Sequence, residues 1–159
     1  MLWITGHAAL TFAPASAKLP LWESQIAMTV FQLVEQSPAV QMVAIEKGLP
    51  SRVLHQLVAL VGVSQKALLE ALGLAPRTIG HRVNKNQRFS ATESERLLRV
   101  IRAQKLAREV FSSDAAVAQW LTAPDPALGK RTPLAMLSTD IGAAQVHNLL
   151  QAMIHGVPL

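Results

Sequence analysis

The sequence predicts an all-α protein. Apolar residues recur at the spacing of a helix rather than with the alternation of a strand, and residues typical of helix starts and ends separate the apolar segments. No segment has a convincing strand pattern, and no internal repeat is evident. With 159 residues, of which 50% are hydrophobic, the chain can bury a core as one domain or as two small ones.

The first helices are predicted from apolar spacing and from helix caps. The helical spacing of Trp22, Ile26, Val30, Leu33 and Val34 predicts a helix over 22–34. Ser37 before Pro38 is a typical helix start and Gly48 a typical end, so we expect a helix over 38–47. A strongly apolar helix is expected within 51–63, after the break at 48–50.

Two short helices are then expected to meet at a sharp turn. Ser64 caps a helix that stops at Gly73, and Pro76 opens the next helix three residues later. Ile79 and Val83, four residues apart, form the inward face of this second helix. A polar loop, 84–88, follows it.

A long helix is expected from the capping box of Ser90 and Glu93 to about Phe111. At ~100° per residue its apolar side chains change direction along the helix. Leu97, Leu98 and Ile101 point one way, whereas Leu106, Val110 and Phe111 point nearly the opposite way. We interpret the long helix as a joint between two modules.

The C-terminal part is predicted to hold three helices. A short helix ends in Trp120 and Leu121, and the proline-rich loop APDPALGKRTP leads to a second short helix that begins at Pro133. Thr139 caps the last helix and Gly156 ends it.

Several function classes are disfavoured by the composition. Without cysteine there is no disulfide and no thiolate zinc site, and the five histidines lack a metal-ligand spacing. Glu93 and Glu95 are two residues apart and face different sides of the helix, and no phosphate-binding or nucleophile motif is present. We therefore expect no enzyme, no metal and no cofactor.

A cytoplasmic, soluble protein without a membrane contact is also expected. No apolar run approaches the ~20 residues that a membrane span needs. The N-terminus lacks the positively charged region of a signal peptide.

Positive charge is concentrated in one segment. Nine Lys and Arg residues against two Glu residues give 76–108 a net charge of +7, although the whole chain carries only +5. A cation excess confined to one segment favours a polyanionic partner. The alternative is a solvated helix face.

The two helices within 65–84 have the layout of a helix-turn-helix that binds double-stranded DNA. Arg77, Thr78, His81 and Asn84 are expected to face the major groove, where Arg reads guanine and Asn reads adenine. Lys85, Arg88 and Ser90 are better placed for phosphates, and Arg82 completes the predicted set. Leu69 lies where this motif usually has a small residue. A helical hairpin that binds no DNA is the alternative.

The chain resembles the Xre/MbcA/ParS antitoxins from about Gly48 to Gly156. The specific signature lies in the C-terminal part: Trp120-Leu121, Pro124, Leu128-Gly129, Thr132-Pro133-Leu134, Thr139 with Gly142, Val146, Leu149 and His155-Gly156. Where the family often has a second glycine after Gly129, this chain has Lys130.

The resemblance implies a type II antitoxin with an Xre-like helix-turn-helix domain and a small helical toxin-binding domain. It also implies a RES-domain toxin that destroys NAD⁺ as partner, a homodimer, and repression of the chain's own operon. The expected domains are 48–111 for DNA binding and 112–159 for toxin binding, with 1–47 as an N-terminal arm and helices that form a candidate dimer contact.

The sequence of the last helix agrees with a surface that binds a partner. Its apolar residues cover a wider arc around the helix than one contact with the core requires. The alternative is a helix that is buried on several sides. The expected toxin-binding residues are Trp120, Leu128, Pro133, Leu134, Val146, Leu149, Leu150, Met153, Ile154, His155 and, if the uncharged tail plugs a cleft, Leu159.

Two other functions remain open at this stage. One is a stand-alone helix-turn-helix repressor whose C-terminal domain dimerises or senses a ligand. The other is a structural adaptor that never contacts DNA, against which the charged segment argues.

Overall fold

The structure is a computed structural model that describes residues 30–156. Residues 22–29 of the first predicted helix, and Leu159, lie outside the described part. In chain order the helices are α2 (Val30–Glu35), α3 (Pro38–Lys47), α4 (Arg52–Val61), α5 (Gln65–Ala71), α6 (Pro76–Asn84), α7 (Ala91–Val110), α8 (Asp114–Thr122), the 3₁₀ turn η1 (Pro126–Leu128), α9 (Pro133–Met136) and α10 (Asp140–His155). The described residues form no strand, so the predicted all-α class is confirmed.

Side-chain caps start these helices where the sequence predicts them. The side chains of Ser37, Ser64 and Thr139 each accept a bond from a backbone N–H in the first turn of their helix. Ser90 and Glu93 form the full capping box at the start of α7. Each cap satisfies a donor that the helix itself leaves without a partner.

One element differs from the prediction. The proline-rich segment after Trp120 was expected to be a loop, but Pro126–Leu128 forms a 3₁₀ turn within it. Asp125 causes the turn, because its side chain accepts a bond from the backbone N–H of Ala127 at 2.9 Å.

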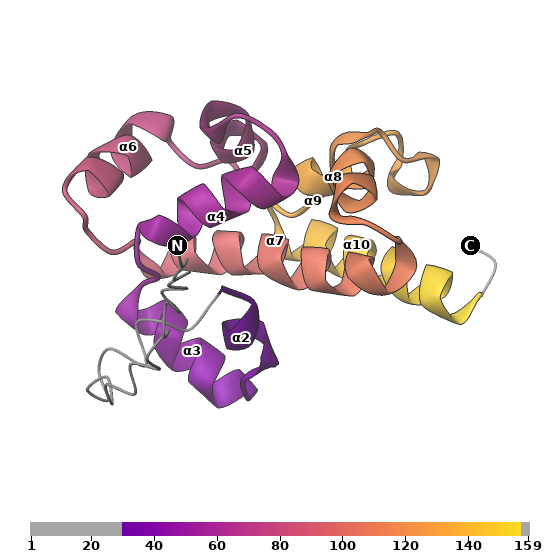
Figure 1. Cartoon of the computed structure of the whole chain (residues 1–159), viewed down its shortest axis with the longest axis horizontal. Coiled ribbons are helices and arrows are strands. Elements are labelled where there is room, and N and C mark those ends of the chain that lie inside the picture. Colours follow the sequence, from indigo (N-terminus) through magenta and orange to yellow (C-terminus); the bar gives the residue numbers. More distant parts are fainter. Residues whose placement is uncertain (1–29, 157–159) are drawn as a thin grey trace, which may run out of the picture.

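The long helix α7 lies in the middle of the molecule (Figure 1) and packs against helices on several sides. It contacts α2 and α3 on one side, α4 and α8 on another, and α10 along its length. Helix α6 lies at the far end of the molecule from the C-terminal end of α10, and α5 lies between α6 and α9 (Figure 1).

A single hydrophobic core runs through the described residues. Leu97, Leu98 and Ile101 of α7 are fully buried, whereas Leu106 and the end of α7 are only partly buried. Helix α4 also packs directly on α8, and α5 on α9, so the N-terminal and C-terminal halves share their core across α7. No helix in the described ranges is both long and apolar enough to cross a membrane.

Candidate DNA-binding and partner-binding surfaces

The turn between α5 and α6 is held by a glycine and by an arginine from α7. Gly73 has a φ of +63°, a backbone conformation that residues with a side chain rarely adopt. Arg96 Nη1 donates to the carbonyl oxygens of Leu72 at 3.2 Å and of Gly73 at 2.7 Å. Because the end of a helix leaves carbonyls without partners, Arg96 both completes α5 and ties the turn to α7.

The predicted inward side chains do pack between α5 and α6. Leu68, Leu72, Leu74 and Ile79 are buried, and Val83 is half-buried. Leu69, the departure from the usual motif, is buried in the same cluster. The extra bulk is therefore absorbed by packing.

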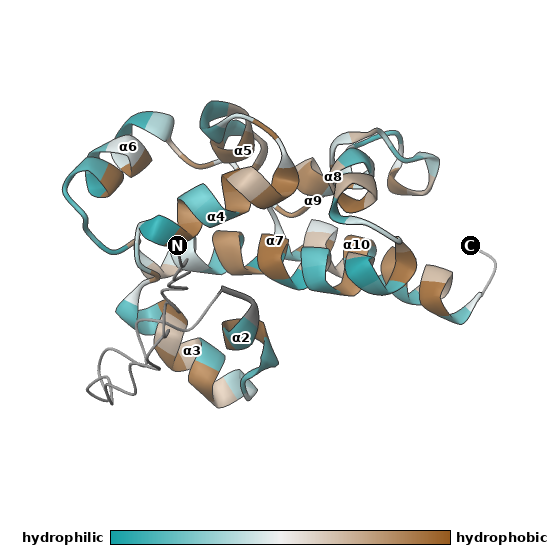
Figure 2. Ribbon diagram, viewed as in Figure 1, coloured by the Kyte–Doolittle hydropathy of each residue, from teal (hydrophilic) through white to brown (hydrophobic). Residues whose placement is uncertain are grey.

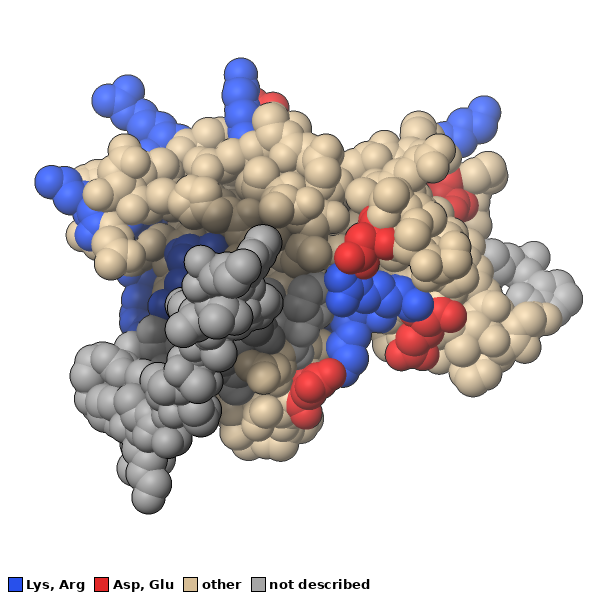
Figure 3. All heavy atoms as spheres, in the orientation of Figure 1, with Lys and Arg blue, Asp and Glu red and all other residues tan. Residues whose placement is uncertain are grey.

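Helix α6 presents five of the predicted DNA contacts on one exposed side. Arg77, Thr78, His81, Asn84 and Lys85 are all exposed. At ~100° per residue they span about a third of a turn, opposite the inward pair Ile79 and Val83. In Figure 3, Lys and Arg side chains project from this end of the molecule without an acidic side chain beside them in that view. Their contact with DNA stays a prediction.

The other three predicted contacts have partners within the chain. Arg82 Nε lies 3.1 Å from Glu93 Oε2, and Arg88 Nη1 donates to the carbonyl oxygen of Gly48 at 2.7 Å. Ser90 Oγ accepts the backbone N–H of Glu93 at 3.2 Å. These groups hold the loop between α6 and α7 in place, whether or not they also contact phosphate.

Most of the other cations in 76–108 also have a partner within the chain. Arg99 pairs with Glu95 and Asp140, Arg102 donates to Gln41 Oε1, Lys105 pairs with Glu35, and Arg108 pairs with Asp114. Of the nine cations in 76–108, only Arg77 and Lys85 have no ion pair or side-chain hydrogen bond within the described part of the chain. Arg82, Arg99, Lys105 and Arg108 are offset by carboxylates, whereas Arg88, Arg96 and Arg102 bond only neutral groups among the described residues and keep their charge, so the positive charge open to a polyanion is smaller than the nine cations suggest.

The C-terminal signature residues mainly build the fold of the chain itself. Leu128, Pro133, Leu134, Val146, Leu149 and Leu150 are buried in its own core. Trp120 is half-buried: its ring lies 5.5 Å from that of Phe111, and its Nε1 donates to Asp125 Oδ2 at 3.2 Å. As direct toxin contacts these residues stay a prediction; in this structure they shape the surface from beneath.

Lys130, which lies where the resemblance predicts a second glycine, has a backbone conformation that glycine favours. Its φ is +64°, in the left-handed region that costs a side chain energy and that glycine adopts freely. Lys130 therefore adopts a backbone conformation in which a glycine would be unstrained.

Exposed apolar side chains remain at both ends of α10. Near the C-terminal end of α10, Met153 is 37% exposed and lies next to half-buried Ile154 and exposed His155. The Nε2 atom of His155 lies 3.2 Å from Gln151 Oε1. Figure 2 shows a hydrophobic stretch near this end of α10, next to hydrophilic residues. Ile141, at the other end of the helix, is 77% exposed.

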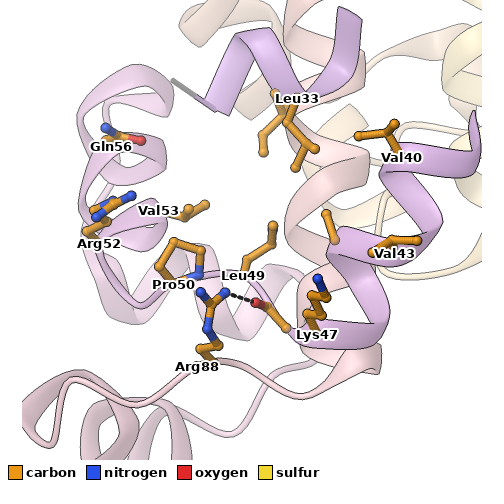
Figure 4. Close-up of a pocket in the computed structure, with 13 residues that line it drawn as sticks. Leu33, Val40, Val43, Lys47, Leu49, Pro50, Arg52, Val53, Gln56 and Arg88 are labelled. Atoms are coloured by element: carbon orange, nitrogen blue, oxygen red, sulfur yellow. Dashed lines mark hydrogen bonds between the residues drawn. The ribbon is translucent and has the colours of Figure 1, made fainter. Parts of the chain in front are cut away.

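An apolar groove between α3 and α4 was not predicted from the sequence. It encloses about 230 Å³, and Leu33, Val40, Val43, Leu49 and Val53 are among its lining residues. Figure 4 shows Val40 and Val43 on one wall, Val53 on the other, and the bond from Arg88 to Gly48 at its base. Its lining also contains three cations, Lys47, Arg52 and Arg88. Its lining comes from residues between Leu33 and Ile101, so no local pattern in the sequence reveals the groove.

No group of three or more His, Cys, Asp or Glu side chains that could hold a metal ion occurs among residues 30–156.

Two family models match the chain. Residues 41–102 match the antitoxin Xre-like helix-turn-helix domain. Residues 106–156 match the C-terminal toxin-binding domain of the antitoxins Xre, MbcA and ParS. Together the two matches cover the helix-turn-helix, the whole of α7 apart from a short gap, and α8 to α10.

Curated relatives include two antitoxins of similar length. Antitoxin Xre of Yersinia enterocolitica is 30% identical over 115 residues, which is 72% of this chain and 78% of the relative. A Sphingobium protein called "Prs ADP-ribosylating antitoxin" is 29% identical over 133 residues, 78% of this chain and 84% of the relative.

A chain in the crystal structure of the Mycobacterium tuberculosis MbcT–MbcA toxin–antitoxin complex has a similar fold. Its TM-score is 0.52 at 19% identity, and the match covers 69% of this chain and 96% of that one.

Proposed function

Because the chain belongs to the Xre/MbcA/ParS antitoxin family, we propose that it binds and blocks a RES-domain toxin that degrades NAD⁺ and represses its own operon. The name of the Sphingobium relative refers to ADP-ribosylation, a reaction that takes ADP-ribose from NAD⁺, so NAD⁺ is the metabolite to follow. The chain acts by binding and not by catalysis.

The C-terminal end of α10 is the surface that we assign to the toxin. It lies within the match to the toxin-binding domain, and Met153 and Ile154 leave apolar area in contact with solvent there. Exposed apolar area beside polar side chains such as His155 is typical of a protein contact. The buried signature residues hold α10 in position for that contact.

A matched pair of variants on α10 tests this assignment. We expect Met153→Lys to weaken toxin binding about tenfold or more, because a charge would then be buried in an apolar contact. Ile141→Lys is the control, since it places the same charge at the other exposed end of the helix. The readout is the loss of NAD⁺ caused by the purified RES-domain toxin from the neighbouring gene, measured with and without each variant.

Three outcomes of this experiment are informative. Suppression of NAD⁺ loss by the unchanged chain and by Ile141→Lys, but not by Met153→Lys, supports the proposal. Full suppression by Met153→Lys contradicts the assignment of the end of α10. No complex between the unchanged chain and the toxin would favour the stand-alone repressor.

We assign operator binding to the exposed face of α6. The face is formed by Arg77, Thr78, His81, Asn84 and Lys85, and their side chains have no hydrogen-bond or ion-pair partner within the described residues that would compete with DNA. Arg82, Arg88 and Ser90 support this face, because their bonds fix the loop that joins α6 to α7.

We further propose a homodimer in which the walls of the α3–α4 groove contact a second copy. Val40 and Val43 are exposed apolar residues on the rim of the groove. Helix α3 lies below α7 in Figure 1, whereas α6 lies above it, and α3 is far from the C-terminal end of α10. A contact on α3 therefore leaves the exposed face of α6 and the end of α10 free, although Arg88 of the loop after α6 lines the groove. Helix-turn-helix proteins commonly bind two half-sites as dimers.

A further inference from the structure

Gly80 is the glycine that the fold does not require. The described residues contain seven glycines, and five of them have positive φ. A Cβ atom on Gly142 would lie 2.0 Å from the carbonyl oxygen of Met136. Neither reason for a glycine applies to Gly80, in the middle of α6. Its φ is not positive, and nothing lies within 4 Å of the position that a Cβ would take.

A glycine inside a helix is destabilising relative to alanine, because it loses more backbone freedom on folding. Since alanine would fit at position 80 without a contact inside the protein, this cost is not offset by packing. Close approach of an external ligand to the helix backbone is a physical reason for a missing side chain that fits an open position.

The position of Gly80 indicates which ligand this is. Residues three and four apart are neighbours on a helix surface, so Arg77 and Asn84 flank Gly80, and both are exposed. At ~100° per residue Gly80 lies about 40° from Asn84 and about 60° from Arg77, so the missing side chain leaves a notch at the edge of the face that we assign to operator DNA. The side chain of Asn84 is short, so it reaches a base edge only if the helix backbone comes close to it.

We propose that the notch at Gly80 receives the 5-methyl group of a thymine, in the A·T pair whose adenine Asn84 reads. Asn binds adenine in bidentate fashion from the major groove, and the thymine of the same pair presents its methyl group there. A methyl group on residue 80 would compete with the thymine methyl and hold Asn84 away from its adenine. The inference rests on the proposed operator binding and adds a specificity-determining residue to it.

The test pairs a methyl group added to the protein with one removed from the DNA. The full chain first selects its preferred duplex from a random-sequence pool. We expect Gly80→Ala to bind that duplex about tenfold more weakly or worse, and to regain most of the loss when deoxyuridine replaces the contacted thymine. The side chain of alanine is the Cβ methyl group alone, so no rotamer turns it out of the way.

Two further readouts separate this effect from misfolding. The thermal midpoint of Gly80→Ala should be equal to that of the unchanged chain or higher, because the φ of residue 80 suits alanine. Binding to a random duplex at low salt should not change, because it depends on phosphate contacts.

Each outcome is decisive. Unchanged affinity of Gly80→Ala, or a loss that deoxyuridine does not restore at any thymine of the site, overturns the inference while operator binding itself stands. If the unchanged chain selects no sequence, the proposed operator binding fails instead.

Discussion

Arg77 and Arg82 are five residues apart on the same helix, yet the structure gives them different roles. Arg77 is exposed and has no ion pair within the described residues, whereas Arg82 pairs with Glu93 at 3.1 Å. Glu93 in turn belongs to the capping box of α7. Substitution of Arg82 would therefore disturb the loop before α7 as well as any DNA contact, and it is a poor probe of recognition.

Arg77→Ala combined with His81→Ala is the cleaner test of the recognition face. We expect affinity for the selected duplex to fall about tenfold or more, because each good base contact contributes about 1–3 kcal/mol. The free energy of unfolding should not change, since both side chains are exposed. Fluorescence anisotropy and urea unfolding measure the two quantities.

Lys66→Ala serves as the matched control for that double variant. Lys66 is an exposed cation on α5, outside the predicted contacts, and pairs only across one turn with Glu70 at 3.8 Å. An equal loss of affinity in Lys66→Ala and in the double variant would contradict a specific role for Arg77 and His81 and would indicate a general charge effect.

At the scale of the element, α7 contains a buried polar side chain without a partner. Gln104 is fully buried, and neither its Nε2 nor its Oε1 has a hydrogen-bond partner among the described residues. Burial of an unpaired amide costs about 1–3 kcal/mol. Helix α7 therefore keeps a polar group in its core at the expense of stability.

Gln104→Leu should raise the free energy of unfolding by about 1–2 kcal/mol, because it removes the unpaired amide and keeps a side chain of similar volume. Gln119→Leu, at an exposed position on α8, is the control and should change stability by less than about 0.5 kcal/mol. Urea unfolding of both variants measures the difference. A lower stability of Gln104→Leu would show that the amide has a favourable partner, such as a buried water.

The positions of the helices could be predicted well because their signals are local. Ser37 with Gly48, Pro76, and Ser90 with Glu93 each act on backbone groups within one helical turn, so the sequence alone contains the information. The 3₁₀ turn at Pro126–Leu128 was not predicted, because a turn of three residues is too short to show a periodic apolar pattern.

The surfaces could be predicted only in part, because they depend on contacts between distant residues. Arg99 and Asp140 are 41 residues apart, so no local pattern shows that Arg99 is engaged. The apolar arc of α10 likewise does not show that Val146, Leu149 and Leu150 face the core while Met153 remains exposed. The fit of these residues to a toxin stays a prediction.

At the scale of the whole molecule, the proposed dimer can be tested through the groove between α3 and α4. We expect Val40→Lys to raise the dimer dissociation constant about tenfold or more, since the new cation would join Lys47, Arg52 and Arg88 in the same groove. Val40 is 43% exposed, so the substitution should leave the fold intact. Sedimentation equilibrium measures the constant.

Met42→Lys provides the control on the same helix. Met42 is 58% exposed and does not line the groove, and it lies about 160° around α3 from Val40. Equal dissociation constants for the two variants would place the dimer contact elsewhere, and a monomeric unchanged chain would contradict the proposed homodimer.

The internal use of the basic side chains has a consequence for how the protein searches DNA. Affinity for DNA falls with salt in proportion to the number of counterions released, with a slope of about −0.9 for each neutralised phosphate. Because Arg82, Arg99, Lys105 and Arg108 are paired with carboxylates, each protomer should release fewer counterions than the nine cations of the basic segment suggest. With the operator binding that we propose, the protein should dwell only briefly on unrelated DNA, and its occupancy of the genome should depend mainly on the match of base edges to α6.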